Sequence, residues 1–159
     1  MIRRAWLPWL GAVVAGLAVG VGVSHIGRDA DFVDFEAGMT ARGELAAALD
    51  GTPSGAFART DAMVVAPLYT VVATDGRVCR AFRAKRGPEA YEAAACREGD
   101  EWRVIVLATV ADPPADFAQG PRAQPVSVMD TIDALRPDKP LSGPAEWALI
   151  VGDWRASAD

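Results

Sequence analysis

The sequence predicts an α+β protein in which one N-terminal transmembrane helix is followed by a small antiparallel β-meander domain with flanking helices. Three observations predict this class. Residues 5–27 are uncharged and largely apolar, turn dipeptides separate β-rich segments between residues 62 and 110, and helix formers flank that region. The predicted division is a transmembrane anchor at 1–27, a juxtamembrane linker at 28–40 and a periplasmic domain at 41–159, which ends in a helical tail at about 125–159.

The apolar segment Ala5–Gly27 has the length of a membrane-spanning helix. As an α-helix it would extend about 34 Å, enough for a hydrocarbon core of about 30 Å. Arg3 and Arg4 precede the segment and acidic residues follow Arg28. This charge asymmetry predicts a bacterial inner-membrane protein with a cytoplasmic N-terminus and a periplasmic domain. A cleaved signal peptide is the alternative, although no Ala-x-Ala site lies near the end of the segment.

Small residues recur at every fourth position of this segment: Ala12, Gly16, Gly20 and Ser24. They would share one face of a helix and permit close packing against another helix. We therefore expect membrane lipid and other transmembrane helices, within a larger membrane protein complex, as partners. The alternative is that Gly and Ala are simply common in such helices. His25, the single histidine, is interpreted as an interfacial polar residue rather than a metal or haem ligand.

The charge balance limits the other partners. The chain has a net charge of −5, and its 16 basic residues include Arg3 and Arg4, so residues 28–159 carry 14 basic against 21 acidic residues. A phosphate-binding surface requires a basic excess. The sequence therefore predicts no nucleic-acid partner.

The predicted meander has strands at 64–65 with 68–73, at 77–84, at 90–98 and at 101–110. Asp75-Gly76 is a two-residue hairpin signal, residues 85–89 with Gly87-Pro88 form the next loop, and Gly99-Asp100 is another tight turn.

The two cysteines fit this meander as a disulfide. Opposed residues of an antiparallel hairpin have a constant sum of residue numbers, and Cys79 and Cys96 add to 175, the value for a loop centred on Gly87-Pro88. Directly opposed residues lie within disulfide range, and a periplasmic domain is in an oxidising compartment. Buried free thiols are the alternative.

Helices are predicted on both sides of the meander. Residues 41–49 are rich in helix formers between Thr40 and Gly51, residues 126–135 place apolar side chains on one face, and Pro144 begins a last helix that ends at Gly152. A strand at 147–151 competes with that helix. Trp147 and Trp154 are expected to pack back on the sheet.

A basic segment stands out in the acidic domain, formed by Arg77, Arg80, Arg83, Lys85 and Arg86. These cations are candidates for binding an acidic partner or lipid headgroups. The alternative is edge-strand charge that prevents aggregation.

The cysteine strands resemble the C-terminal domain of the proteobacterial 17 kDa surface-antigen family. The resemblance covers residues 75–104 and rests on Cys79-Arg80-Ala81-Phe82, then Ala95-Cys96-Arg97, a turn and the Trp102 strand. It implies an envelope location, a small β domain and no catalysis. The chain departs from the family pattern at Ala81, where a glutamate is expected, and it has no lipidation cysteine.

Catalytic motifs are missing from the sequence. With one histidine at position 25, the domain has no Ser-His or Cys-His pair, and it has no Gly-rich phosphate loop or Cys-x-x-Cys-His haem motif. We therefore expect no enzyme, no cofactor and no metal. The sequence favours an accessory or structural subunit of a larger membrane complex, of the respiratory or photosynthetic kind. The alternative is a stand-alone, surface-antigen-like binding or sensing module of the envelope.

Overall fold

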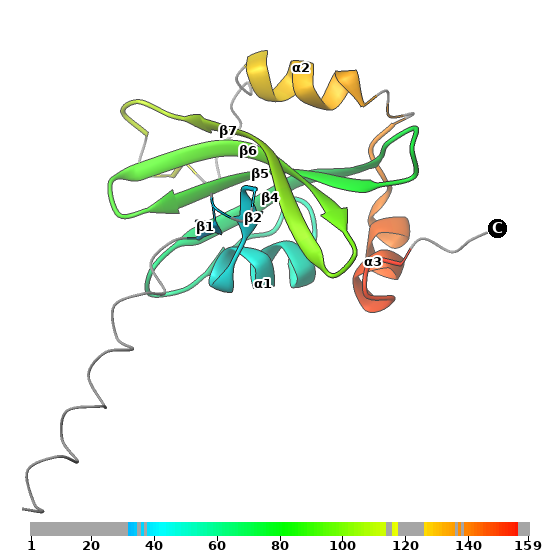
Figure 1. Cartoon of the computed structure of the whole chain (residues 1–159). Helices are drawn as coiled ribbons and strands as arrows, with labels where there is room; N and C mark the ends of the chain where they lie inside the picture. Colours follow the sequence, from blue (N-terminus) through cyan, green and yellow to red (C-terminus); the bar gives the residue numbers. More distant parts are fainter. Residues whose placement is uncertain are drawn as a thin grey trace, which may run out of the picture. The chain divides into compact units, whose positions relative to one another are not determined.

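The structure is a computed structural model that describes residues 32–34, 36, 38–113, 116–117, 126–135, 137 and 139–155. Along these residues it has seven strands and three short helices (Figure 1). The predicted helix at 5–27 lies outside the described residues. Within the described part of the chain, no helix is long and apolar enough to cross a membrane.

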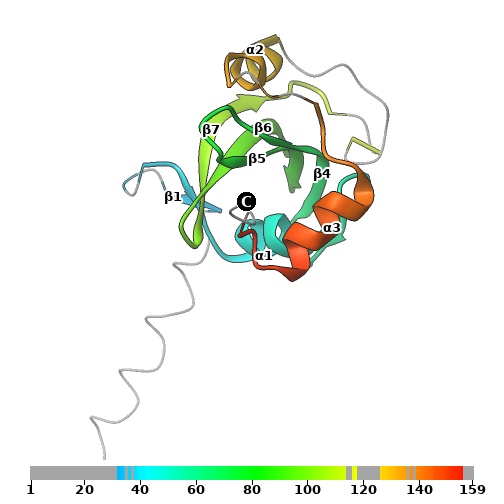
Figure 2. The same cartoon turned by 90° about the vertical axis from the view of Figure 1, so that its right-hand side faces the viewer.

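All seven strands form one antiparallel sheet in the order β1-β2-β7-β6-β5-β4-β3. Its centre consists of four long strands: β4 (Val64–Val72), β5 (Val78–Arg86), β6 (Glu89–Glu98) and β7 (Glu101–Thr109). Two-residue strands flank them: β1 (Val33–Asp34), β2 (Thr40–Ala41) and β3 (Ala58–Arg59). Figure 2 shows the sheet curling as a half-barrel around helix α1 (Gly43–Gly51).

The predicted fold class is therefore wrong. Instead of a transmembrane helix followed by a small four-stranded meander, the described chain is a seven-stranded half-barrel sheet with three helices of nine residues each. Strands of two residues are too short to show the alternation on which strand prediction depends. In addition, β2 pairs with β7 far along the chain, and no local pattern indicates such a pairing.

Turns set the register of the long strands. The β5–β6 hairpin has the predicted register, from Cys79 opposite Cys96 to Arg86 opposite Glu89, so its loop is Gly87-Pro88 alone. The Asp75-Gly76 hairpin differs from the prediction, because the N–H of Ala73 donates to Arg77 O and a three-residue loop remains between them. Gly76 has φ +83, as the left-handed position of such a loop requires.

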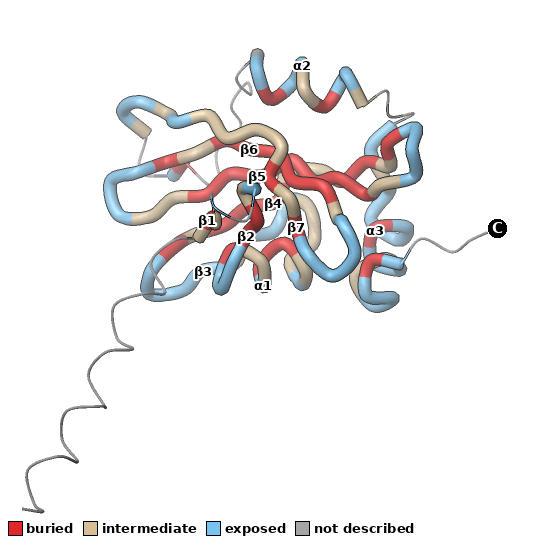
Figure 3. Tube along the Cα trace, in the orientation of Figure 1, coloured by how far each residue is buried: buried red, intermediate tan, exposed pale blue. Residues whose placement is uncertain are grey.

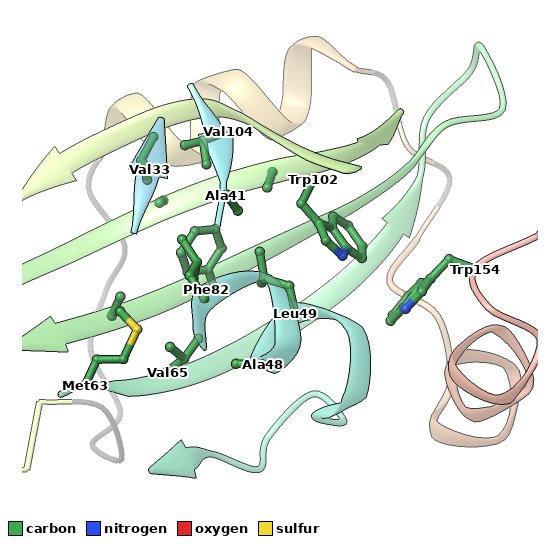
Figure 4. Close-up of a cluster of buried hydrophobic side chains, with 14 of the residues drawn as sticks. Val33, Ala41, Ala48, Leu49, Met63, Val65, Phe82, Trp102, Val104 and Trp154 are labelled. Atoms are coloured by element: carbon green, nitrogen blue, oxygen red, sulfur yellow. The ribbon is translucent and has the colours of Figure 1, made fainter. Parts of the chain in front are cut away.

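The main core lies between the concave face of the sheet and α1, where Leu45 and Leu49 of the helix are fully buried. Phe82 of β5 and Trp102 of β7 are their largest partners on the sheet, as Figure 4 shows for Leu49. Burying each such side chain stabilises the fold by about 1.5–3 kcal/mol. This cluster is what holds the curved sheet around the helix.

The convex face carries a second, smaller core under helix α2 (Val126–Ala134), which confirms the predicted helix in this region. Val128 and Ile132, one turn apart, are its buried side chains. The disulfide Cys79–Cys96 lies in this core, and the two Cα atoms are 3.9 Å apart. The predicted disulfide is therefore present.

Helix α3 (Gly143–Val151) starts with Pro144 in its first turn and ends at Gly152, as predicted, and the competing strand at 147–151 is wrong. Trp154 packs on the sheet as expected, edge to face against Trp102 with ring centroids 5.0 Å apart. Trp147 does not, since 54% of its surface is exposed.

Candidate functional site

A buried ion pair fixes α3 to the sheet. Arg80 of β5 and Glu146 of α3 are 0% and 3% exposed, and their Nη2 and Oε1 atoms are 3.1 Å apart. The carboxylate of Glu146 also accepts hydrogen bonds from the hydroxyls of Ser54 and Thr70 and from the N–H of Ser54 at 2.8 Å. Arg80 Nε donates to Thr70 Oγ1 at 3.1 Å, so the pair belongs to one connected polar network.

The same arginine caps the C-terminus of α1. Arg80 donates from Nη1 to the carbonyl oxygen of Leu49 and from Nη2 to that of Thr52, the latter at 2.6 Å. The last carbonyl groups of a helix lack internal partners and carry the negative end of its dipole, so a guanidinium is stabilised there. Arg97 of β6 acts at the same helix end and donates to the carboxylate of Asp50 at 2.7 Å.

Alternation along the strands explains why each cysteine is followed by an arginine. Successive side chains of a strand point to opposite faces. Cys79 and Cys96 therefore meet on the convex face, while Arg80 and Arg97 reach the concave face at the end of α1. In the repeated Cys-Arg pair, on which the family resemblance rests, the cysteines stabilise the convex face of the β5–β6 hairpin. The arginines bind the end of α1 on its concave face.

Two tryptophans complete the junction between α1, the sheet and the C-terminal segment. Trp102 and Trp154 donate their indole N–H groups to the Asp50 carboxylate at 2.7 Å and to the Asp50 carbonyl at 3.0 Å. Arg80 lies over the ring of Trp154 at 4.8 Å, and Arg97 lies over the ring of Trp102 at 5.5 Å. Such cation–π contacts strengthen when they are desolvated. The contacts of Trp154 therefore hold the C-terminal end of α3 on the domain, while the Arg80–Glu146 pair holds its first turn.

The electrostatics of the pair follow from burial and hydrogen bonding. Burial lowers the pKa of Arg80 to about 10, although the charge of Glu146 and its hydrogen bond act in the opposite direction. Burial alone would raise the pKa of Glu146, but the hydrogen bonds from Ser54 and Thr70 and the charge of Arg80 bring its pKa below the usual 4.5. Both groups are therefore charged at neutral pH, and the two hydroxyls are used as donors to the carboxylate.

The outer face of α3 is apolar. Glu146 is the only buried residue of this helix, Leu149 and Ile150 are half-buried, and Trp147 and Val151 are 54% and 67% exposed. Pro144, Ala145 and Ala148 are exposed as well. We call Pro144, Ala145, Trp147, Ala148 and Val151 the α3 face; Figure 3 shows this helix mainly in the exposed colour. The carboxylate that faces inward and the apolar side chains that face outward reverse the usual arrangement of a surface helix.

The predicted basic segment does not form an exposed stripe. Arg80 and Arg83 are buried, at 0% and 2% exposure, so their guanidinium groups are not on the surface of the domain. Arg77 forms a half-exposed ion pair with Asp75 at 2.8 Å, and Lys85 and Arg86 are half-buried at the end of β5. The alternative of edge-strand charge is wrong, because β5 lies between β4 and β6.

Arg83 belongs to a second buried ion pair, on the convex face. Its Nε atom lies 2.9 Å from Oε1 of Glu92, the residue directly opposite on β6, and both side chains are 3% exposed. Phe117 is fully buried against this pair, with its ring centroid 5.5 Å from the guanidinium. The alternation that places Arg80 on one face of β5 places Arg83 on the other.

The predicted helix-packing residues Ala12, Gly16, Gly20 and Ser24, and His25, lie outside the described residues. Sequence reasoning missed Glu146 and the α3 face, although α3 did contain a signal, since its one charged residue stands among apolar ones.

Within the described ranges, no group of three or more His, Cys, Asp or Glu side chains is placed to hold a metal ion. Comparison of the chain with protein-family models, curated proteins and solved structures gives no significant match.

Proposed function

We propose that the protein is a non-enzymatic accessory protein, located outside the cytoplasm, whose domain binds a larger membrane protein complex through the α3 face. The exposure of Trp147 and Val151 carries this proposal. Contiguous apolar surface on a folded domain is typical of interaction sites, and tryptophan is among the residues that contribute most to interface affinity. Trp147 and Val151 lie one helical turn apart, the spacing by which a helix enters an apolar groove.

The composition of α3 favours a protein over a lipid surface as the partner. Helices that lie on membranes carry basic residues on their polar face. Helix α3 has no lysine or arginine, and its one charged residue is buried against Arg80. Lipid headgroups would therefore find no cation on this helix, whereas an apolar protein groove would match it.

The disulfide supports the proposed location. Structural disulfides persist in oxidising compartments and are rare in the cytosol. Cys79 and Cys96 are bonded and fully buried. The resemblance to the surface-antigen family and the Arg3/Arg4 charge before an apolar segment favour the same compartment.

The location predicts the behaviour of reporter fusions. A reporter that is active only in the periplasm should be active when fused after Asp159, and a reporter that is active only in the cytoplasm should be silent at the same position. Deleting residues 1–27 should reverse both signals, which serves as the control. The opposite pattern in the full-length fusion would contradict the location and leave the disulfide without an oxidising compartment.

The docking role predicts a large effect at Trp147. Trp147→Ser should weaken binding to the complex about 30-fold, the effect of losing an interface contribution of about 2 kcal/mol. The measurement is recovery of the partner complex with the tagged full-length chain, purified in a mild detergent from cells that express it naturally. The melting temperature should stay unchanged, because more than half of the Trp147 surface is exposed.

Phe57→Ser is the matched control, since Phe57 is a similarly exposed aromatic residue at 47% that lies outside α3. It should leave the recovery of the complex unchanged. Equal losses for Trp147→Ser and Phe57→Ser would contradict a specific α3 interface. A chain that purifies as a free monomer at native expression levels would contradict the accessory role itself.

A further inference from the structure

The outer edge of β7 is only partly covered. On one side β7 pairs with β6 along its whole length, whereas on the other side it pairs with β2 at Arg103 and donates one further hydrogen bond, from the N–H of Val104 to the carbonyl oxygen of Met39. Gly38 and Met39 both have positive φ, which turns the chain away from the edge at that point. No described residue pairs with the outer edge of β7 from Ile105 to Thr109.

The hydrogen bonds of β7 show which backbone groups point outward. The N–H of Val110 donates to Ala90 O on the β6 side. Because the direction alternates along a strand, the backbone groups of Ala108 also face β6, and those of Leu107 and Thr109 face outward. Ile105 is the bulged residue, since Val104 lies opposite Ala95 and Val106 lies opposite Ala94. At the open edge, Leu107 and Thr109 therefore each present one N–H donor and one carbonyl acceptor that face outward.

The side chains of this edge do not oppose pairing. Residues 104–111 contain no charge and no proline, and they are rich in β-branched residues. Natural sheets usually protect an open edge by short strands, charges or proline. The outermost strands β1 and β3 follow that rule, with two residues each and a charged residue at their ends, Asp34 and Arg59. The edge of β7 does not.

We propose that β7 of a second copy of this chain adds to this edge in the antiparallel direction. In the symmetric register, Ala108 of one copy lies opposite Ala108 of the other, and Leu107 of each copy exchanges hydrogen bonds with Thr109 of its mate. Such a contact is isologous, because the same strand serves both copies. The proposal is independent of the α3 face, which lies on a different element.

Charge favours the second copy as the occupant. The chain has a net charge of −5, so two copies repel over most of their surface, but residues 104–111 bring no charge into the contact. The paired segment 107–109 therefore opposes no like charges, and the repulsion between two acidic copies falls outside the contact.

Engineered cysteines test this register in the full-length chain. The native cysteines are bonded to each other, so one added thiol reports on contact between copies. Ala108→Cys should give a disulfide-linked dimer on mild oxidation, because directly opposed Cα atoms lie within disulfide range. Thr109→Cys, one residue away, should stay monomeric. Equal crosslinking of the two variants, or no crosslinking of Ala108→Cys, would overturn the proposal.

Thr109→Pro separates this contact from association through other parts of the chain. Proline removes the outward N–H of Thr109 and leaves the bonds between β6 and β7 intact. In light scattering with detergent correction, the wild-type protein mass should correspond to two chains, and the Thr109→Pro mass to one. A wild-type protein of one chain, or a Thr109→Pro protein that remains at two chains, would refute pairing through β7.

Discussion

Replacing Glu146 with Gln should lower the free energy of unfolding by about 3–5 kcal/mol. The substitution removes the counter-charge of Arg80 and leaves a fully buried guanidinium without a carboxylate, which is the costly way to break a buried ion pair. The same change loosens α3, whose other core contacts come from half-buried Leu149 and Ile150. Equilibrium unfolding in urea, followed by tryptophan fluorescence, measures the effect, because Trp154 is next to Arg80.

Glu101→Gln is the matched control. Glu101 pairs with Arg42 at 2.8 Å, but both side chains are about half exposed, so its loss should cost less than about 1 kcal/mol. The double variant Arg80→Met/Glu146→Leu should recover much of the stability, since apolar residues of similar size can replace a buried pair. If Glu146→Gln were no more destabilising than Glu101→Gln, the buried network would have no part in fixing α3.

The pH dependence of this pair has a definite sign. The pKa of Glu146 is below 4.5 in the folded protein, so the unfolded chain binds its proton more readily. The stabilisation from Glu146 is therefore complete above pH 4.5 and is lost as the pH falls through the folded pKa. Between pH 7 and pH 3, the unfolding free energy of the wild type should fall more steeply than that of Glu146→Gln.

Local sequence signals predicted the centre of this fold well. Gly87-Pro88 and Gly99-Asp100 are turn dipeptides, and the alternation on either side of them fixes which residues oppose each other. The Cys79–Cys96 pair follows directly, because a hairpin with a known turn has a known register. Helix α3 was found in the same way, from Pro144 at its start and Gly152 at its end.

The edges of the sheet could not be predicted. Strands β1, β2 and β3 have two residues each, and they become strands only because the neighbouring long strand supplies their hydrogen bonds. Thr40, for instance, pairs with Arg103, which lies far along the chain. A pairing of this kind is a property of the folded sheet and leaves no pattern in the segment itself.

The site was misread because charge was taken as evidence of exposure. Arginines are rarely buried unless they are paired, and the partner of Arg80 is Glu146, 66 residues away. The alternation of side chains along β5 could have predicted that Arg80 is buried. Arg80 shares its face of β5 with Phe82, so a strand whose Phe82 enters the core must turn Arg80 inward as well.

Removing the disulfide should also destabilise the protein strongly. Cys79 and Cys96 are 17 positions apart, and a link of that length stabilises a fold by about 3 kcal/mol on the chain-entropy model. A domain of this size has about 5–15 kcal/mol in total. Cys79→Ala/Cys96→Ala should therefore unfold at a clearly lower urea concentration. The wild-type protein under reducing conditions is the control and should unfold close to the double variant.

The disulfide and the α3 face should be separable, because they lie on different parts of the domain. Cys79 and Cys96 are buried in the convex core with Val128 and Ile132 of α2, whereas α3 is held by Arg80 and the junction at Trp154. The folded double variant should therefore keep the binding that depends on Trp147. Thiol labelling of unreduced, unfolded wild-type protein should find no free thiol, and two labelled thiols in protein taken directly from the envelope would refute the bond.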